Sequence, residues 1–143
     1  MTIQAILDRK GSTVFTIHPT ATVRSAVDQM NKRGVAALVV EGATGVQGLV
    51  SERNVVSAIS QYGASAITMT VKDIFTQTSI SVAPGDSIKK AMSLMTIQRL
   101  RQLPVIADGR LVGIISIGDV VKHRLEDLET ESNILRDLYV AAR

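Results

Sequence analysis

The chain has 143 residues, of which 45% are hydrophobic and 20% charged, and its formal net charge at pH 7 is +3. This much apolar surface offsets the entropy of ordering and excludes intrinsic disorder, while no apolar run reaches the roughly 18 residues of a membrane-spanning helix. The absence of cysteine excludes disulfide scaffolds, thiol nucleophiles and cysteine-ligated metal sites. With no signal-peptide pattern at the N-terminus, we expect a soluble, globular, cytoplasmic protein.

The first half of the chain predicts an alternation of strands and helices. Pro19 is expected to end the first strand, because proline cannot continue a hydrogen-bonded ladder. Thr22 is expected to cap the next helix, whose apolar residues recur at spacings of three and four. The expected elements are a short helix within 1–12, a strand at 14–17, a helix from Val23, strands at 37–40 and 46–50, and a helix opening at Asn54.

The second half predicts the same order of elements. Ser87 stands where Thr22 stands in the first half and is expected to cap a helix in the same way. The expected elements are a short helix at 71–75, a strand at 79–82, a helix from Ile88, strands at 103–106 and 110–115, and one long helix over 119–141.

The two halves are copies of one unit. Residues 14–59 align with residues 79–124 at a constant offset of 65, without a gap, and nine of the 46 aligned positions are identical. Nine identities would be weak alone, but an ungapped register with apolar positions matched to apolar ones makes chance unlikely. We therefore expect an α/β (α+β) fold of two tandem strand–helix–strand–strand–helix repeats related by pseudo-twofold symmetry, plus a long C-terminal helix. The expected domains are residues 1–68 and 69–143.

A candidate binding site lies where the strand at 110–115 meets the helix from Asp119. The ionised carboxylate of Asp119 can accept hydrogen bonds from the vicinal hydroxyls of a ribose, and Ser116 with the first amides of the helix would donate to an anion. The alternative is structural: Asp119 caps the helix and Ser116 is a turn residue. In the first repeat Asn54 replaces Asp119 while Ser51 matches Ser116, so we expect a weaker or different site there.

Three motifs carry a resemblance to a known family. They are GIISIGD at 113–119, GLVSERN at 48–54 and RLRQLPV at 99–105. The chain resembles the cystathionine-β-synthase-type (CBS) domain family over residues 13–125, and two such domains in tandem form the unit called a Bateman module. The resemblance implies a non-enzymatic module that binds AMP, ADP, ATP, NAD(H) or S-adenosylmethionine in clefts between the paired domains. Since no enzyme or transporter domain accompanies the repeats, we expect a stand-alone member.

The resemblance also implies which residues would line the clefts. Arg101 and its neighbours would lie near phosphate or sugar, and the strand that opens the second repeat would offer backbone groups and an apolar wall to adenine. Arg53 aligns with Gly118 and presents planar donors suited to phosphate, although it could instead be a solvated side chain paired with Glu52. The nucleotide-binding residues expected are Thr78, Ile80, Val82, Arg53, Arg101, Gln102, Leu103, Pro104, Ser116, Ile117, Gly118 and Asp119. A possible second site would use Ile17, Ala36, Ala37, Ser51 and Asn54.

The expected function is that of a sensor. A bound nucleotide, AMP first among those named, would shift the protein towards one shape or change its affinity for an effector protein. The alternatives are a ligand-free assembly protein, favoured by Asn54 and the apolar segment 34–38, and a weak nucleic-acid binder. We expect no catalytic residue and no metal site, because the two histidines are isolated and no HExxH, GxGxxG or P-loop motif occurs.

The C-terminal helix predicts how the chain assembles. Monomers rarely expose apolar patches beyond a few hundred Å², so we expect a homodimer in which two such helices cover each other. Folding of the helix back onto its own repeat is the alternative, and no membrane partner is expected. The apolar residues concerned, spaced mainly by three and seven, are Leu125, Leu128, Ile134, Leu135, Leu138 and Val140.

Overall fold

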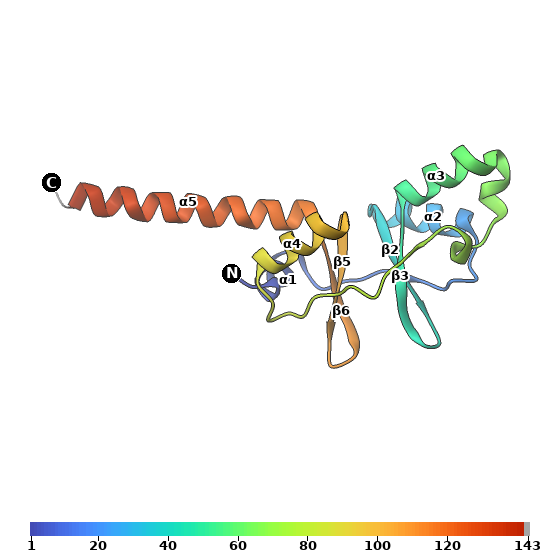
Figure 1. The fold of residues 1–143 in the computed structure, drawn as a ribbon, viewed down its shortest axis with the longest axis horizontal. Helices are drawn as coiled ribbons and strands as arrows, with labels where there is room; N and C mark the ends of the chain where they lie inside the picture. The colour runs from blue at the N-terminus through green and yellow to red at the C-terminus, as the bar shows by residue number, and fades with distance from the viewer. Residues whose placement is uncertain (142–143) are drawn as a thin grey trace. The chain divides into compact units, whose positions relative to one another are not determined.

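The computed structural model describes residues 1–141, which fold into two compact units (Figure 1). Residues Val14–Ile80 form the first-repeat unit, and Met1–Thr13 together with the chain from Ser81 onward form the second-repeat unit. The α/β fold of two repeats with a long C-terminal helix is confirmed. In the structure the N-terminal helix belongs to the second-repeat unit. The expected domain boundary between residues 68 and 69 places this helix with the first repeat instead.

The first-repeat unit is built on a four-stranded sheet in the order β1-β2-β3-β4. Strand β1 runs parallel to β2, while β2 with β3 and β3 with β4 are antiparallel. The glycine-rich turn between β2 and β3 closes the hairpin that the sequence predicts. The elements are β1 (Thr16–Ile17), α2 (Val23–Arg33), β2 (Ala37–Gly42), β3 (Gly45–Ser51), α3 (Glu52–Tyr62), the 3-10 helices η1 (Gly63–Thr68) and η2 (Val71–Asp73), and β4 (Thr76–Gln77).

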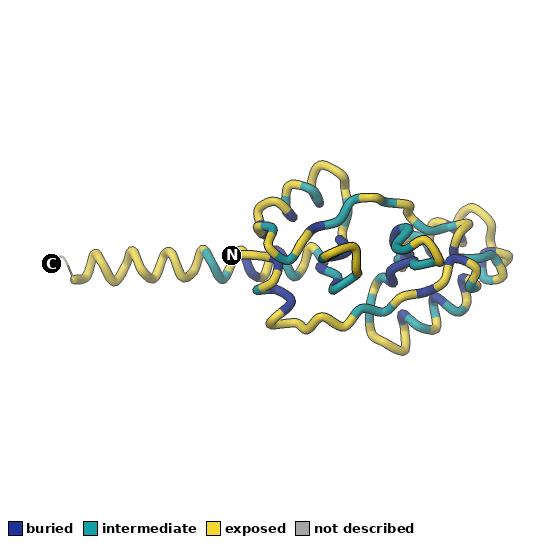
Figure 2. The backbone as a smooth tube through the Cα atoms, turned by 90° about the horizontal axis from the view of Figure 1, so that it is seen from below, coloured by how far each residue is buried: buried dark blue, intermediate teal, exposed yellow. Residues whose placement is uncertain are grey.

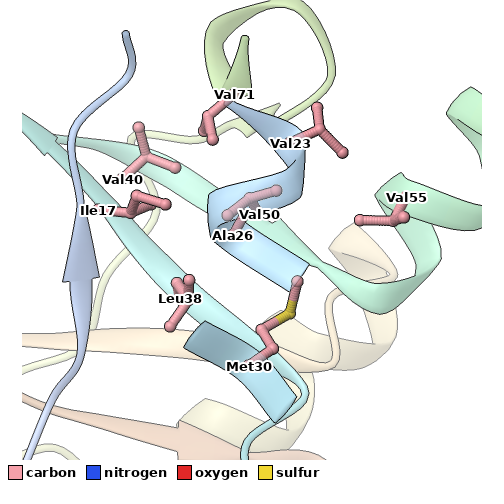
Figure 3. Packing of buried hydrophobic residues seen from close by; sticks show 9 residues of the cluster. All are labelled: Ile17, Val23, Ala26, Met30, Leu38, Val40, Val50, Val55 and Val71. Atoms are coloured by element: carbon pink, nitrogen blue, oxygen red, sulfur yellow. The ribbon is translucent and has the colours of Figure 1, made fainter. Parts of the chain in front are cut away.

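The core of this unit lies between α2 and the sheet (Figure 3). Val23, Ala26 and Met30 form the buried stripe of α2, because residues spaced by three and four share one face of a helix. They belong to the same buried cluster as Leu38 of β2 and Val71 of η2. The segment before β4 therefore completes the core of the first repeat.

The second-repeat unit repeats this plan around a shorter sheet. Its hairpin β5-β6 is antiparallel, and Val82 forms a parallel bridge to Val105. That bridge is the counterpart, at the offset of 65, of the pairing between Ile17 of β1 and Val40 of β2. No helix among residues 1–141 is long and apolar enough to cross a membrane. The elements are α1 (Ile3–Lys10), α4 (Ile88–Gln98), β5 (Gln102–Ala107), β6 (Arg110–Ser116) and α5 (Ile117–Ala141).

The start of each helix shows which boundary predictions are right. The hydroxyl of Thr22 accepts a hydrogen bond from the Ser25 amide, and the hydroxyl of Ser87 accepts one from the Lys90 amide, which confirms both caps. The predicted openings of the last helix in each repeat, at Asn54 and Asp119, are two residues late. These helices begin at Glu52 and Ile117, because the preceding serines cap them.

The strand predicted at 79–82 is wrong except at its last residue. Only Val82 pairs with another strand, whereas β4 at Thr76–Gln77 pairs with β3 and was not expected. The hydroxyl of Thr78 accepts a hydrogen bond from the amide of Ile80, which turns the backbone between the two segments.

Each repeat is completed by a short segment from another part of the chain, residues 69–77 for the first repeat and residues 1–12 for the second. Residues 1–7 (MTIQAIL) match residues 69–75 (MTVKDIF) at an offset of 68 rather than 65. The Ile3 amide donates to the Asp86 carbonyl at 2.9 Å, and the Val71 amide donates to the Ala21 carbonyl at 2.8 Å. The other matching bonds are Gln4 amide to Pro84 carbonyl with Lys72 amide to Pro19 carbonyl, and Ile88 amide to Met1 carbonyl with Val23 amide to Met69 carbonyl. We call residues 1–12 and 69–77 the leading segments.

Candidate functional site

A reciprocal pair of hydrogen bonds joins the end of β6 to the first turn of α5. The Ser116 hydroxyl accepts from the Asp119 amide at 3.2 Å, and the Asp119 carboxylate accepts from the Ser116 amide at 2.8 Å. This arrangement is a capping box, which satisfies amides that a helix start leaves without intrahelical partners. Ser116 is therefore the cap, and Asp119 is the third residue of the helix. The structural alternative is right that these two residues form the helix start, but it names Asp119 as the cap where the structure has Ser116.

Lys10, at the end of α1, contacts the same carboxylate. Its ammonium donates to Oδ2 of Asp119 at 2.7 Å and to the carbonyl of Ile114 at 3.1 Å. Oδ2 also receives the Ser116 amide, and no described residue donates to Oδ1. The Asp119 side chain is 23% exposed, so this second oxygen is able to accept hydrogen bonds from a ligand.

The protonation of Asp119 is set by two opposed effects. Partial burial acts to raise the pKa of the carboxyl, because desolvation disfavours the charged form. The hydrogen bond from Lys10, the bonds from Ser116 and the Lys10 charge outweigh burial, and the pKa lies below its usual value. Asp119 is therefore ionised at neutral pH and suited to bind hydroxyl donors.

The first repeat holds the same arrangement with uncharged groups. The Ser51 hydroxyl accepts from the Asn54 amide at 3.3 Å, and Oδ1 of Asn54 accepts from the Ser51 amide at 2.9 Å. The Asn54 side-chain amide donates to the Thr76 hydroxyl at 3.1 Å. Thr76 belongs to a leading segment, as Lys10 does, so each capping box is tied to the leading segment of its own unit. The two sites differ in charge. They also differ in free acceptor atoms, because Asp119 has a second carboxylate oxygen where Asn54 has an amide nitrogen.

Three more predicted residues surround the start of α5. Ile117 and Gly118 are exposed in its first turn, where amides without intrahelical partners gather. Arg101 is exposed immediately before β5, and its carbonyl accepts the Ile117 amide at 2.8 Å. Gln102, half-buried, pairs with Ser116 across the β5-β6 hairpin. The structure thus brings these residues together with Asp119 in one unit.

Several predicted contact residues are instead core residues. Val82, Leu103 and Pro104 are buried in the second-repeat unit, and Ile17 is buried in the first-repeat unit. Both backbone groups of Val82 are engaged in the sheet, since its amide donates to Pro104 and its carbonyl accepts from Ile106. Their side chains hold the sheet in place and have little surface to offer an adenine in this conformation.

The remaining predicted residues lie in the first-repeat unit. Thr78 lines an open recess of about 610 Å³ together with Gln47, Gln77 and Ser79, all with polar side chains, while Ile80 is half-buried nearby in sequence. Arg53 is exposed in the first turn of α3, and among the described residues no ion pair joins it to Glu52. Ala36 is exposed and accepts the Glu52 amide through its carbonyl at 3.0 Å, while Ala37 pairs with Ser51 in the sheet.

Two capped α/β repeats of this kind define a tandem domain pair, and comparison with known proteins identifies the family. The sequence model described as "CBS domain" matches residues 10–61 and 71–126. The chain belongs to the CBS domain family. A mitochondrial CBS domain-containing protein of Arabidopsis thaliana, CBSX3, is 40% identical over 106 residues, which are 71% of this chain and 52% of that protein. The chain thus spans about half the length of this relative.

Solved structures support the same fold. A CBS-domain protein from Agrobacterium tumefaciens is 36% identical, with a TM-score of 0.81 over 86% of this chain and 92% of that chain. A hexameric CBS-CP12 protein from bloom-forming cyanobacteria is 29% identical, with a TM-score of 0.74–0.75 over 85% of this chain and 66–69% of that chain. The structure of CBSX2 in complex with AMP matches with 24% identity and a TM-score of 0.69, over 87% of this chain and 96% of that chain, which establishes likeness of fold.

Proposed function

We propose that the chain is a non-catalytic regulatory module that binds an adenosine-containing nucleotide, AMP first among them, at the start of α5. The observation that carries the proposal is the Asp119 carboxylate, which is half-buried and has one oxygen outside the capping box. The vicinal hydroxyls of a ribose are donors that match such an acceptor. AMP is the first ligand to test because the related CBSX2 structure contains it.

Lys10 supports this proposal through its effect on Asp119. Its ammonium favours the ionised carboxylate, and hydroxyl donors bind a carboxylate more strongly than a neutral acid. The exposed first turn of α5 offers the Gly118 amide and the positive end of a helix dipole to a phosphate, while the Ile117 amide already donates to the Arg101 carbonyl. One helical turn thus provides a hydrogen-bond acceptor for the ribose hydroxyls and a hydrogen-bond donor for the phosphate, and a nucleotide presents both groups.

Signalling follows from differential affinity. A nucleotide shifts the protein between conformations only if it binds one of them more tightly than the other. Both Lys10 and Asp119 belong to the second-repeat unit but come from opposite ends of the chain, on α1 and α5. A ligand whose hydroxyls donate hydrogen bonds to Asp119 changes the partners of Lys10, and α1 is then the element that responds. The effector protein that reads this change, and the cytoplasmic location, stay predictions.

A thermal-unfolding screen tests the proposal. The full chain is heated with AMP, adenosine, ATP, NADH, S-adenosylmethionine or a short DNA duplex. A ligand at 100 times its dissociation constant adds about 2.7 kcal/mol of stability, so we expect a clear rise of the transition with at least AMP. No shift with any adenosine compound would contradict nucleotide binding and favour a ligand-free assembly protein; a shift with DNA alone would favour nucleic-acid binding.

A further inference from the structure

The second half of helix α5 is exposed along its whole described length. Every residue from Leu128 to Ala141 is exposed, and this part of the helix extends past α1 and α4 of its own unit (Figures 1 and 2). Isolated helices of about 12–15 residues are marginal in water, and helices in proteins gain most of their stability from packing of an apolar face. A partner for this face is therefore needed.

Three leucines of α5 follow a heptad pattern. When the seven positions of each heptad are lettered a to g, Leu128 and Leu135 occupy position d. Position a holds Leu125, Ser132 and Tyr139. The three leucines are 56%, 44% and 68% exposed. A seam spaced alternately by three and four residues is the pattern by which two helices pack knobs into holes. The seam predicts a helix as its partner rather than a flat surface.

We propose that the partner is a second copy of this chain and that the two α5 helices form a parallel, in-register coiled coil from about residue 121 to 139. The charges beside the seam support a parallel pair. Position g holds Arg124 and Glu131, and position e holds Glu129 and Arg136. In a parallel pair, each g residue faces the e residue five positions later in the partner. Arg124 then faces the partner's Glu129, and Glu131 faces the partner's Arg136. Because the pair is symmetric, each of these contacts occurs twice, and all four are between opposite charges.

An antiparallel pair with the same overlap is opposed by these charges. When the helices cross at Thr130, Leu125 packs near the partner's Leu135, as the seam requires. However, antiparallel helices bring g to g and e to e, which sets Glu131 against the partner's Glu131 and Glu129 against the partner's Glu129. Like charges at these positions select against an arrangement. Antiparallel pairs shifted along the helix relieve this repulsion but leave one end of the leucine seam uncovered.

Parallel pairing has one consequence for the rest of the molecule. Asp119 lies in the first turn of the same helix, so the two copies of Asp119 come to the same end of the coiled coil. Pairing of the helices itself does not depend on a nucleotide.

Cross-linking of single-cysteine variants tests the orientation, because the natural chain has no cysteine. Leu125→Cys and Leu135→Cys are each oxidised in the otherwise full-length protein, and Thr130→Cys, on the outer face of the helix, is the matched control. Disulfides need Cα atoms within about 7 Å, so only the parallel in-register pair cross-links at both 125 and 135. We expect dimers from both variants and none from the control. Cross-linking at one position only, at neither, or equally at all three would overturn the proposal.

Charge exchange provides an independent readout of partner contacts. In sedimentation equilibrium, Glu131→Arg is expected to weaken dimerisation about two- to tenfold, since both copies lose an attractive pair. Adding Arg136→Glu restores the pair with reversed sign and should recover the natural affinity. Asp137→Arg, on the outer face, should leave it unchanged. A monomeric natural protein, or a double variant no tighter than the single one, would contradict the parallel pair.

Discussion

Lys10 and Asp119, at opposite ends of the chain, form an ion pair of 2.7 Å that ties α1 to the first turn of α5. The first repeat makes the same connection between Thr76 and Asn54 with a neutral hydrogen bond of 3.1 Å. Each repeat thus anchors the third residue of its last helix to a leading segment. Only the second repeat does so with charges, which is why the proposed nucleotide site is assigned to it.

Replacing Lys10 by Met should make stability less dependent on acid pH. The pKa of Asp119 is lowered in the folded protein, so its contribution is fully present above the unfolded-state value of about 3.9 and is lost as pH falls through the folded-state pKa. Urea unfolding of both proteins between pH 7 and pH 2.5 measures this. The gap in unfolding free energy should be largest near neutral pH and shrink below about pH 4. A gap that stays constant with pH, or one equal to that of the exposed-lysine control Lys89→Met, would argue against the ion pair.

Gly48 and Gly113, equivalent in the two repeats, should respond differently to alanine. A Cβ on Gly48 would overlap the backbone carbonyl of Thr76 in β4, which cannot move without detaching the strand. On Gly113 a Cβ would lie 2.7 Å from the end of the Leu7 side chain, which can change rotamer. We expect Gly48→Ala to cost about 1–3 kcal/mol in denaturant unfolding and Gly113→Ala less than about 1 kcal/mol. Equal losses would show that both leading segments are equally rigid.

Arg53 is expected to discriminate phosphate if it contacts the ligand. A guanidinium donates to a phosphate but has no anion to bind in adenosine. Arg53→Ala should therefore weaken AMP about tenfold, the value of one charge-assisted hydrogen bond, and leave adenosine nearly unchanged. Arg24→Ala, an exposed arginine on α2, is the control. Parallel calorimetric titrations decide the matter: equal losses for AMP and adenosine would assign Arg53 a structural role only.

Much of the fold could be predicted because its signals are local or repeated. The caps at Thr22 and Ser87, the hairpin turns and the stripe of α2 each depend on residues a few positions apart. The short helices within 1–12 and at 71–75 were expected, but the likeness of the two leading segments was not, because the match of residues 1–7 to 69–75 is shifted by three residues from the main repeat. A search for repeats that allowed a gap would have found the shared Met-Thr start.

The candidate site was predicted in part for the same physical reason. Asp119 and Ser116 are three residues apart, so their bond can be anticipated from a helix start. Lys10 is 109 residues from Asp119, and nothing in the sequence near either residue marks the contact. Burial of Val82 and Leu103 could not be predicted either, because the sequence pattern of an apolar strand residue is the same whether the side chain faces a core or a ligand.

Calorimetric titration of AMP into Asp119→Asn, Asn54→Asp and the natural protein tests the central claim most directly. Asparagine keeps the capping box, as Asn54 does in the first repeat, so Asp119→Asn removes the charge without removing the helix start. We expect it to weaken AMP by about tenfold or more, the value of charge-assisted bonds to the ribose, and we expect Asn54→Asp not to weaken AMP. Unchanged AMP affinity in a folded Asp119→Asn protein would contradict a nucleotide site at the start of α5.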